Sequence, residues 1–162
     1  MTVELGYGLD EFRATMARFA SGVVVATTRD ADGNPHGFTA SSFCSVSLDP
    51  PLVLVCLART ANSYEAFRSS SACAISILAE DQVGVARRFA TKGGDKFGEG
   101  GFVELPNGSL GVSGALGVLE CSVRDRHAAG DHVILVAEVR GIERGEGGPM
   151  VYFGGAFHRL GS

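Results

Sequence analysis

The N-terminal part of the chain carries apolar residues at a helical spacing. They recur every three or four positions, at Leu9, Phe12, Met16 and Phe19. This spacing predicts an amphipathic helix over residues 9–20, which ends at the Ser21-Gly22 pair. Two more short helices are predicted, one over residues 63–69 and one over residues 80–90.

Short runs rich in β-branched residues predict strands in most of the remaining chain. These runs are residues 22–28, 37–47, 52–58, 72–78, 116–127, 132–145 and 149–155. The run 52–58 is apolar at consecutive positions, which predicts that both of its faces are covered. The glycine-rich segment 91–101 predicts a mobile loop without regular structure.

This succession of elements predicts a mainly β fold. Strands that follow one another through tight turns pair antiparallel, and a sheet that closes on itself has no exposed edge. We therefore predict six or more mainly antiparallel strands in a closed or nearly closed barrel, with about three short helices. The 162 residues are enough for a single domain spanning residues 1–162.

Composition and charge narrow the possible partners. The formal net charge is −4, and no cluster of Lys and Arg is typical of a nucleic-acid-binding surface. The apolar runs are shorter than a bilayer span requires, and the first nine residues lack the pattern of a secretory signal. We expect a cytoplasmic protein without nucleic-acid or membrane partners. Since 45% of the residues are hydrophobic, either the core is large or another subunit covers apolar surface.

Several common site signatures are absent from the sequence. There is no G-x-G-x-x-G turn, no phosphate-binding P-loop, no G-x-S-x-G elbow and no H-E-x-x-H helix. The four histidines are scattered, and the four cysteines show no C-x-x-C spacing. We therefore predict no metal site, and we interpret the cysteines as small buried thiols.

Hydroxyl side chains gather just before the strand 52–58. Thr39, Ser41 and Ser42 flank Ala40, and such short side chains can donate or accept hydrogen bonds close to a flat ligand. A heteroaromatic ring with donors and acceptors along one edge would fit this segment. The alternative is a strand that exposes its Ser and Thr residues to water.

The segment after that strand is a candidate phosphate site. Arg59, Thr60 and Ser63 could donate hydrogen bonds, and the start of the predicted helix offers unpaired N–H groups. The alternative is an ordinary N-x-x-E helix cap formed by Asn62 and Glu65. Together with the hydroxyl residues, this segment could hold the ring and the phosphate of one ligand.

Three further places carry candidate residues. The triplet Gly130-Asp131-His132 lies at a hairpin before a long strand, where a histidine is often merely exposed. Phe89, Lys92, Lys96 and Phe97 bracket the glycine-rich stretch of the loop, and its basic residues could close over an anionic ligand or simply be solvated. Tyr152 in the last strand could stack on a ligand or belong to the core.

Several motifs follow one another along nearly the whole chain. They are FASGVVVATT at 19–28, TASSF at 39–43 with S-x-D-P-P-L at 47–52, VARRFATKGGDKF at 85–97, the GDH triplet at 130–132 and VYFGGAFHRL at 151–160. In this order the chain resembles the flavin reductase-like split-barrel family, the short NAD(P)H:flavin oxidoreductases that serve two-component flavin-dependent monooxygenases. The resemblance implies a six-stranded antiparallel Greek-key split barrel that works as a homodimer with FMN or FAD at the subunit interface.

The resemblance also implies roles for individual residues. The implied cofactor residues are Thr39, Ala40, Ser41 and Ser42 at the isoalloxazine ring, Cys56, Asn62 and Ser63 at the ribityl chain and phosphate, Phe89 and Lys96 near the flavin tail, and Tyr152 beside the ring or the nicotinamide. His132 would contact the nicotinamide. Cys44 stands where relatives often carry Thr or Ser.

The implied activity is hydride transfer from NADH or NADPH to FMN or FAD, with the reduced flavin passed to a partner monooxygenase. Two alternatives stay open. One is a split-barrel flavoenzyme that holds its flavin tightly and reduces its own substrate. The other is a non-catalytic module that binds flavin or haem.

Overall fold

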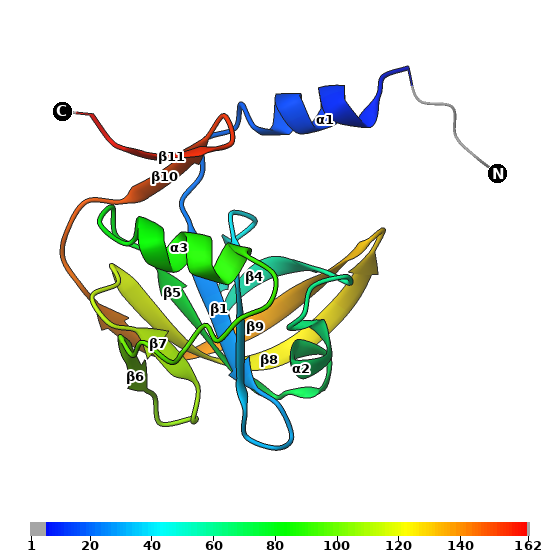
Figure 1. Ribbon diagram of the computed structural model, residues 1–162. Helices are drawn as coiled ribbons and strands as arrows, with labels where there is room; N and C mark the ends of the chain where they lie inside the picture. Colours follow the sequence, from blue (N-terminus) through cyan, green and yellow to red (C-terminus); the bar gives the residue numbers. More distant parts are fainter. Residues whose placement is uncertain (1–5, 162) are drawn as a thin grey trace.

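A seven-stranded antiparallel sheet forms the body of the molecule (Figure 1). The computed structural model describes residues 6–161. The strand order is β2 (Pro35–Ala40), β1 (Val24–Arg29), β5 (Ala72–Ile77), β8 (Gly117–Ala129), β9 (His132–Arg144), β4 (Pro51–Ala58) and β3 (Cys44–Leu48). Two small hairpins join β6 (Phe102–Glu104) to β7 (Leu110–Val112) and β10 (Met150–Phe153) to β11 (Ala156–Arg159). The helices are α1 (Leu9–Met16), α2 (Tyr64–Ser69) and α3 (Val83–Ala90).

The mainly β architecture with three helices is confirmed, and the strand count is corrected. The main sheet has seven strands rather than six, and β6, β7 and β11 were not expected. These three strands have only three or four residues each, which is too short for an alternating pattern to stand out. Neighbours such as β1 with β5 and β9 with β4 are not consecutive in the chain, so the sheet is not a simple meander.

The predicted strand 37–47 is wrong as a single element, because the chain changes partner in its middle. Residues up to Ala40 pair with β1, and residues from Cys44 onwards pair with β4. Since β2 and β3 are the two edges of the sheet, the link Ser41–Phe43 spans from one edge to the other. The sheet must therefore curl until its edges approach each other, as in a split barrel. Beyond the Cys44–Leu54 pair β3 no longer covers β4, so there the split lies between β2 and β4.

Strand β4 differs from the expectation that both of its faces are covered. Val53, Val55 and Leu57 are buried inside the barrel, whereas Leu54 and Cys56, which alternate with them, are half-buried. Leu54 and Cys56 lie on the outer side of the strand, which is only partly covered. One side of β4 belongs to the core, and the other is available to line a site.

The helices are shorter than predicted and differ at their ends. Helix α1 stops at Met16 and buries none of its residues, so it projects from the body beside the β10–β11 hairpin (Figure 1). Helix α3 begins at Val83, and the acidic pair Glu80-Asp81 precedes it instead of occupying its first turn. The expected N-x-x-E cap of α2 is absent, because Ser63 is the N-cap residue and makes no capping side-chain hydrogen bond.

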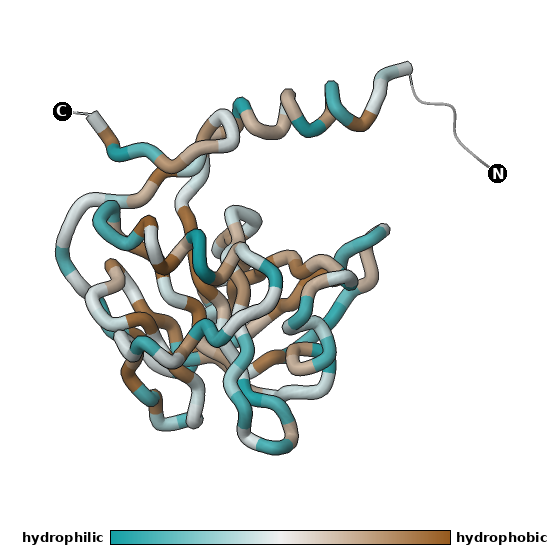
Figure 2. Tube along the Cα trace, in the orientation of Figure 1, coloured by the Kyte–Doolittle hydropathy of each residue, from teal (hydrophilic) through white to brown (hydrophobic). Residues whose placement is uncertain are grey.

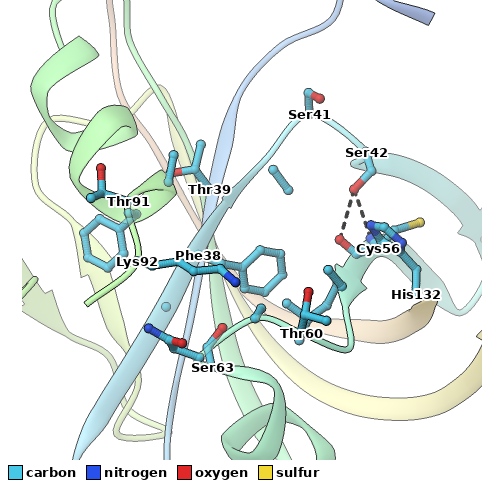
Figure 3. A pocket seen from close by; sticks show the side chains of 18 of the residues that line it. Phe38, Thr39, Ser41, Ser42, Cys56, Thr60, Ser63, Thr91, Lys92 and His132 are labelled. Carbon is cyan, nitrogen blue, oxygen red and sulfur yellow. Dashed lines mark hydrogen bonds between the residues drawn. The ribbon is translucent and has the colours of Figure 1, made fainter. Parts of the chain in front are cut away.

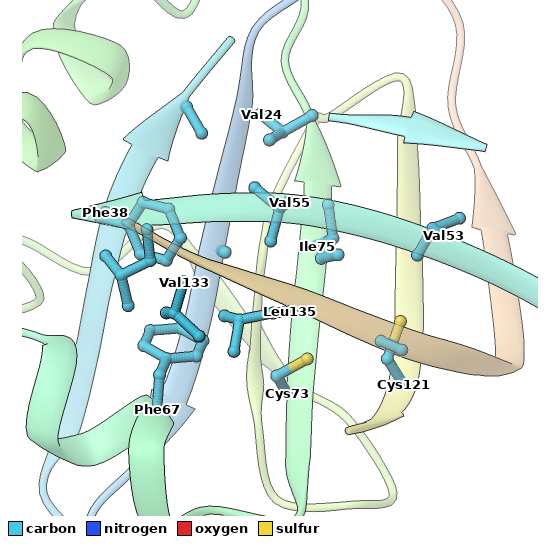
Figure 4. Packing of buried hydrophobic residues seen from close by; sticks show 14 residues of the cluster. Val24, Phe38, Val53, Val55, Phe67, Cys73, Ile75, Cys121, Val133 and Leu135 are labelled. Atoms are coloured by element: carbon cyan, nitrogen blue, oxygen red, sulfur yellow. The ribbon is translucent and has the colours of Figure 1, made fainter. Parts of the chain in front are cut away.

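Hydrophobic stretches of the chain run through the body of the molecule (Figure 2), and their buried residues form two apolar clusters. The larger one fills the barrel and includes Phe67, Ile75 and Leu135 (Figure 4). The second lies under α3 and includes Phe89 and Met150. The expectation of buried thiols holds for Cys73 and Cys121, but Cys44 is exposed and Cys56 is half-buried.

Candidate functional site

A cleft of about 400 Å³ opens at the split between β2 and β4 (Figure 3). Its walls are the end of β2, the end of β4, the start of α2, the end of α3 and the loop after α3. It is lined by Gly37, Phe38, Thr39, Ala40, Ser41, Ser42, Cys56, Leu57, Ala58, Thr60, Ala61, Asn62, Ser63, Phe89, Ala90, Thr91, Lys92, Lys96 and His132. Ten of the eleven predicted site residues lie in this set, and Tyr152 is the exception.

Ser42 joins the two sides of the split (Figure 3). Its hydroxyl oxygen accepts a hydrogen bond from the backbone N–H of Cys56 at 3.0 Å and donates one to the Cys56 carbonyl at 3.3 Å. The ladder between β3 and β4 ends at the Cys44–Leu54 pair, so Cys56 has no strand partner on that side. The Ser42 hydroxyl takes the place of the missing strand partner and holds the segment 39–42 against β4. We call this segment the hydroxyl wall of the cleft.

The other wall residues are held by helix α3. The Thr39 hydroxyl donates to the Ala86 carbonyl of α3 at 2.7 Å, so its hydrogen is already engaged within the protein. A Cβ atom at Gly37 would lie 2.8 Å from the Phe89 ring, so only glycine lets α3 approach β2 this closely. Ala40 is buried and Ser41 is exposed at the rim. The wall is therefore small, neutral and rigid.

Ser63 is an unpartnered hydroxyl within the cleft wall. The residue is only 4% exposed, and its hydroxyl oxygen has no hydrogen-bond partner among the described residues. An unsatisfied buried hydroxyl costs about 1–3 kcal/mol, so its presence calls for an explanation. A ligand group in the cleft that accepts a hydrogen bond from the Ser63 hydroxyl would explain it. Asn62 beside it is exposed at the same end of the cleft.

Two lysines bring positive charge to the end of the cleft near Ser63. Lys96 turns back on its own loop, where its ammonium group donates to the carbonyls of Thr91 at 2.5 Å and Gly93 at 2.9 Å. Lys92 is exposed on the lining. The expected irregular loop 91–101 is confirmed, since it contains no helix or strand. Its lysines place positive charge at this end of the cleft, which suits an anionic ligand group.

His132 lies at the other end, beside Ser42 and Cys56 (Figure 3). It opens β9 opposite Ala58, and the Arg59 N–H donates to the Asp131 carbonyl at 3.0 Å, which ties the hairpin to β4. The His132 Nδ1 and Asp131 Oδ1 atoms are 2.7 Å apart. The hydrogen bond and charge of His132 lower the pKa of the Asp131 carboxyl below its usual value. The carboxylate therefore orients the imidazole, whose Nε2 edge is left for a ligand.

Tyr152 is not part of the cleft, so the structure does not bring it together with the other predicted residues. It lies in a larger groove between α1 and the β10–β11 hairpin, beside Phe157, with ring centroids 5.5 Å apart. This groove has a volume of about 960 Å³ and shares Ser41 and Ser42 with the cleft. Ser41 and Ser42 therefore line both the cleft and the groove that contains Tyr152.

Several lining residues were not predicted as site residues. Phe38 and Leu57 come from strands and belong to the barrel core, so their sequence pattern does not separate lining from core. Thr91 lies on a loop whose path the sequence does not specify, whereas Lys92 on the same loop was already a candidate for an anionic ligand. Arg59 was a candidate phosphate donor, but it is exposed and does not line the cleft.

The described residues contain no group of three or more His, Cys, Asp or Glu side chains that could hold a metal ion. Over the same residues, no helix is long and apolar enough to cross a membrane.

Comparison with known proteins identifies relatives over nearly the whole chain. A family described as "Flavin reductase like domain" matches residues 16–161. The chain is 50% identical over 149 residues to the actinorhodin polyketide dimerase of Streptomyces coelicolor, covering 91% of this chain and 84% of that protein. It is 41% identical over 154 residues to the NADH:riboflavin 5'-phosphate oxidoreductase of Streptomyces pristinaespiralis, covering 93% and 88%.

A solved structure has the same fold. The NADH:FAD oxidoreductase SgcE6 of Streptomyces globisporus, in complex with NAD and FAD fragments, superposes with a TM-score of 0.89 at 34% identity, and 98% of each chain is covered. Other relatives are named as reductase subunits or components of monooxygenases, two of them flavin-dependent by name. Some relatives are longer, and the chain spans 42% of one of them. These likenesses confirm the split-barrel fold class.

Proposed function

The chain belongs to the flavin reductase-like family, and we propose that it transfers a hydride from NADH or NADPH to FMN or FAD and releases the reduced flavin to a partner monooxygenase. The observation that carries this proposal is the polarity of the cleft. One end is a small neutral wall, and the other end has a buried free hydroxyl and two lysines. This arrangement fits a flat ring at one end and a phosphate at the other.

The residues present fit a flavin, whose ring accepts the hydride. Ser41, Ser42 and Ala40 would bound the ring, and the Ser42–Cys56 hydrogen bonds keep that wall from moving. Ser63 would donate to the phosphate. Because the wall is uncharged, it favours moderate affinity, which suits a flavin that must leave after reduction. Hydride transfer requires close placement of the two rings, so positioning is the main task of the protein.

His132 would orient the nicotinamide. Its imidazole is fixed by Asp131 at 2.7 Å and lies at the ring end of the cleft, away from the phosphate end. It is 45% exposed, so a second ligand can reach it from solvent. Hydride transfer needs no general acid or base at this position. His132 therefore acts on the binding of the nicotinamide and on its orientation.

We expect a homodimer for two physical reasons. Helix α1 presents Leu9, Phe12 and Met16 to solvent, and Phe19 after it is 80% exposed. This apolar surface borders the groove that shares Ser41 and Ser42 with the cleft. A second copy that covers it would also close the ring end of the cleft. The proposed reaction would draw on the NADH pool of the cell, so we expect a cytoplasmic protein.

The test is NAD(P)H oxidation by the purified protein with FMN, FAD, riboflavin or no added flavin. The proposal expects oxidation that depends on added flavin, with little flavin retained after gel filtration. Activity with retained flavin and no response to added flavin would favour an enzyme with its own substrate. Flavin or haem binding without NAD(P)H oxidation would favour a non-catalytic module.

A further inference from the structure

A second cavity of about 250 Å³ opens beside the phosphate end of the cleft. We call it the side pocket. It is lined by Pro35, His36, Gly37, Asn62, Ser63, Gly93, Gly94, Asp95, Lys96 and Phe97. Gly37, Asn62, Ser63 and Lys96 line the cleft as well, so these residues form a junction between the two cavities.

The junction carries two free hydrogen-bond donors. The Ser63 hydroxyl is buried and has no partner among the described residues. The Lys96 ammonium group has three hydrogens, of which two point at the carbonyls of Thr91 and Gly93. The third is available, and its charge strengthens any hydrogen bond to a phosphate. The junction is therefore suited to a pyrophosphate that passes from one cavity into the other.

The far part of the side pocket has a different chemistry. Phe97 offers an apolar surface, and its ring packs edge-on against Phe89 with centroids 5.1 Å apart. The Asp95 carboxylate holds the turn by accepting from the N–H groups of Phe97 and Gly98, both at 3.0 Å. A carboxylate repels a further phosphate and accepts from hydroxyl or amino groups. The pocket therefore favours a nucleoside over a free phosphate.

We propose that the side pocket binds the adenylate half of FAD, so that FAD is the preferred flavin of this protein. The inference rests on the proposed function, because it assumes that a flavin ring lies against the hydroxyl wall. The tail of that flavin would reach Ser63 and Lys96, and in FAD the next group is the adenosine. The relatives do not decide this point, since one is named for riboflavin 5'-phosphate and another for FAD.

The other adenylate in the reaction belongs to the nicotinamide cofactor. His132 does not line the side pocket, and Figure 3 shows it apart from Ser63 and Thr91. If the nicotinamide ring of NADH stacks near His132, the rest of the NADH molecule starts at the end of the cleft that is opposite the side pocket. The side pocket therefore continues the path of the flavin and not that of NADH.

Two variants of His36 give a matched test. His36 lines the side pocket but not the cleft, and its Nε2 lies 2.8 Å from Asp30 Oδ2. Both His36→Trp and His36→Ala lose this contact, but only the tryptophan fills the pocket. We expect His36→Trp to weaken FAD binding about tenfold and to leave FMN binding within about twofold of wild type. His36→Ala should leave both affinities near wild type. The measurement is flavin fluorescence titration.

The wild-type protein provides a second test that needs no variant. It should bind FAD at least about tenfold more tightly than FMN, and AMP should compete with FAD but not with FMN. Equal affinity for the two flavins would overturn the inference. So would a rise in the NADH KM of His36→Trp without a change in FAD affinity, which would assign the pocket to NADH. If no flavin supports NADH oxidation, the proposed function fails instead.

Discussion

Replacing Ser63 with alanine should have opposite effects on the stability and on the function of the protein. The hydroxyl is buried in a residue that is 4% exposed, and it has no partner among the described residues. Burial of such an unsatisfied group costs about 1–3 kcal/mol, so its removal should raise the free energy of unfolding of the ligand-free protein by about 1 kcal/mol. A hydrogen bond to a charged phosphate contributes about 1.5–3 kcal/mol, so flavin binding should weaken about tenfold or more.

Ser76 provides the matched control. It is 0% exposed, and its hydroxyl oxygen accepts from the Val112 N–H at 2.9 Å. Ser76→Ala leaves that N–H without this acceptor, which should lower the free energy of unfolding by about 1–3 kcal/mol. Ser76 does not line the cleft, so flavin affinity should not change.

The assay combines urea unfolding of the ligand-free proteins with flavin fluorescence titration. A change in the urea midpoint with an unchanged slope would report stability alone. If Ser63→Ala destabilised the ligand-free protein as Ser76→Ala does, the hydroxyl would have a partner within the protein. If flavin affinity also stayed at the wild-type value, Ser63 would have no role at the phosphate.

Three further predictions concern other parts of the molecule. His132→Ala should raise the KM for NADH about tenfold while flavin affinity stays constant, and unchanged steady-state kinetics would remove His132 from the site. The pKa of the Asp30 carboxyl is lowered mainly by the hydrogen bond with the His36 side chain and, to a smaller extent, by backbone N–H donors. The ionised carboxylate therefore contributes stability above about pH 4, and this contribution is lost as the pH falls through the lowered pKa. Asp30→Asn should accordingly lose less stability than wild type between about pH 5 and pH 3 in urea unfolding, and parallel losses would refute this. A double change of Phe12 and Met16 to serine should turn the expected dimer into a monomer in light scattering with no loss of monomer stability, because α1 buries none of its residues.

Much of the site was predictable because its residues lie in short, local motifs. Thr39 to Ser42 and Asn62 to Ser63 each come from one continuous stretch, so placing the two stretches on either side of β4 was enough to bring them together. Phe38 and Leu57 were missed for the converse reason. They alternate along strands like any core residue, and only the curl of the sheet exposes part of them to the cleft.

The wrong predictions concern features that depend on contacts between distant parts of the chain. Hydroxyl residues recur from Thr39 to Ser47 on both sides of the crossing, so their composition does not show that the chain passes to the opposite edge of the sheet after Ala40. Tyr152 is placed by its bridge to Ser21, a contact between distant parts of the chain, and this bridge holds it in the groove beside α1. The spacing in α1 predicts a helix but does not reveal that none of the helix residues is buried against the part of the chain that the structure describes.

The most direct test of the account is a crystal structure grown with excess FMN or FAD. The account predicts the isoalloxazine ring against Ser41 and Ser42 in the split between β2 and β4, and the phosphate beside Ser63. One face of the ring should be open toward His132. Flavin bound elsewhere, or a cleft closed by protein atoms in the presence of saturating flavin, would contradict it.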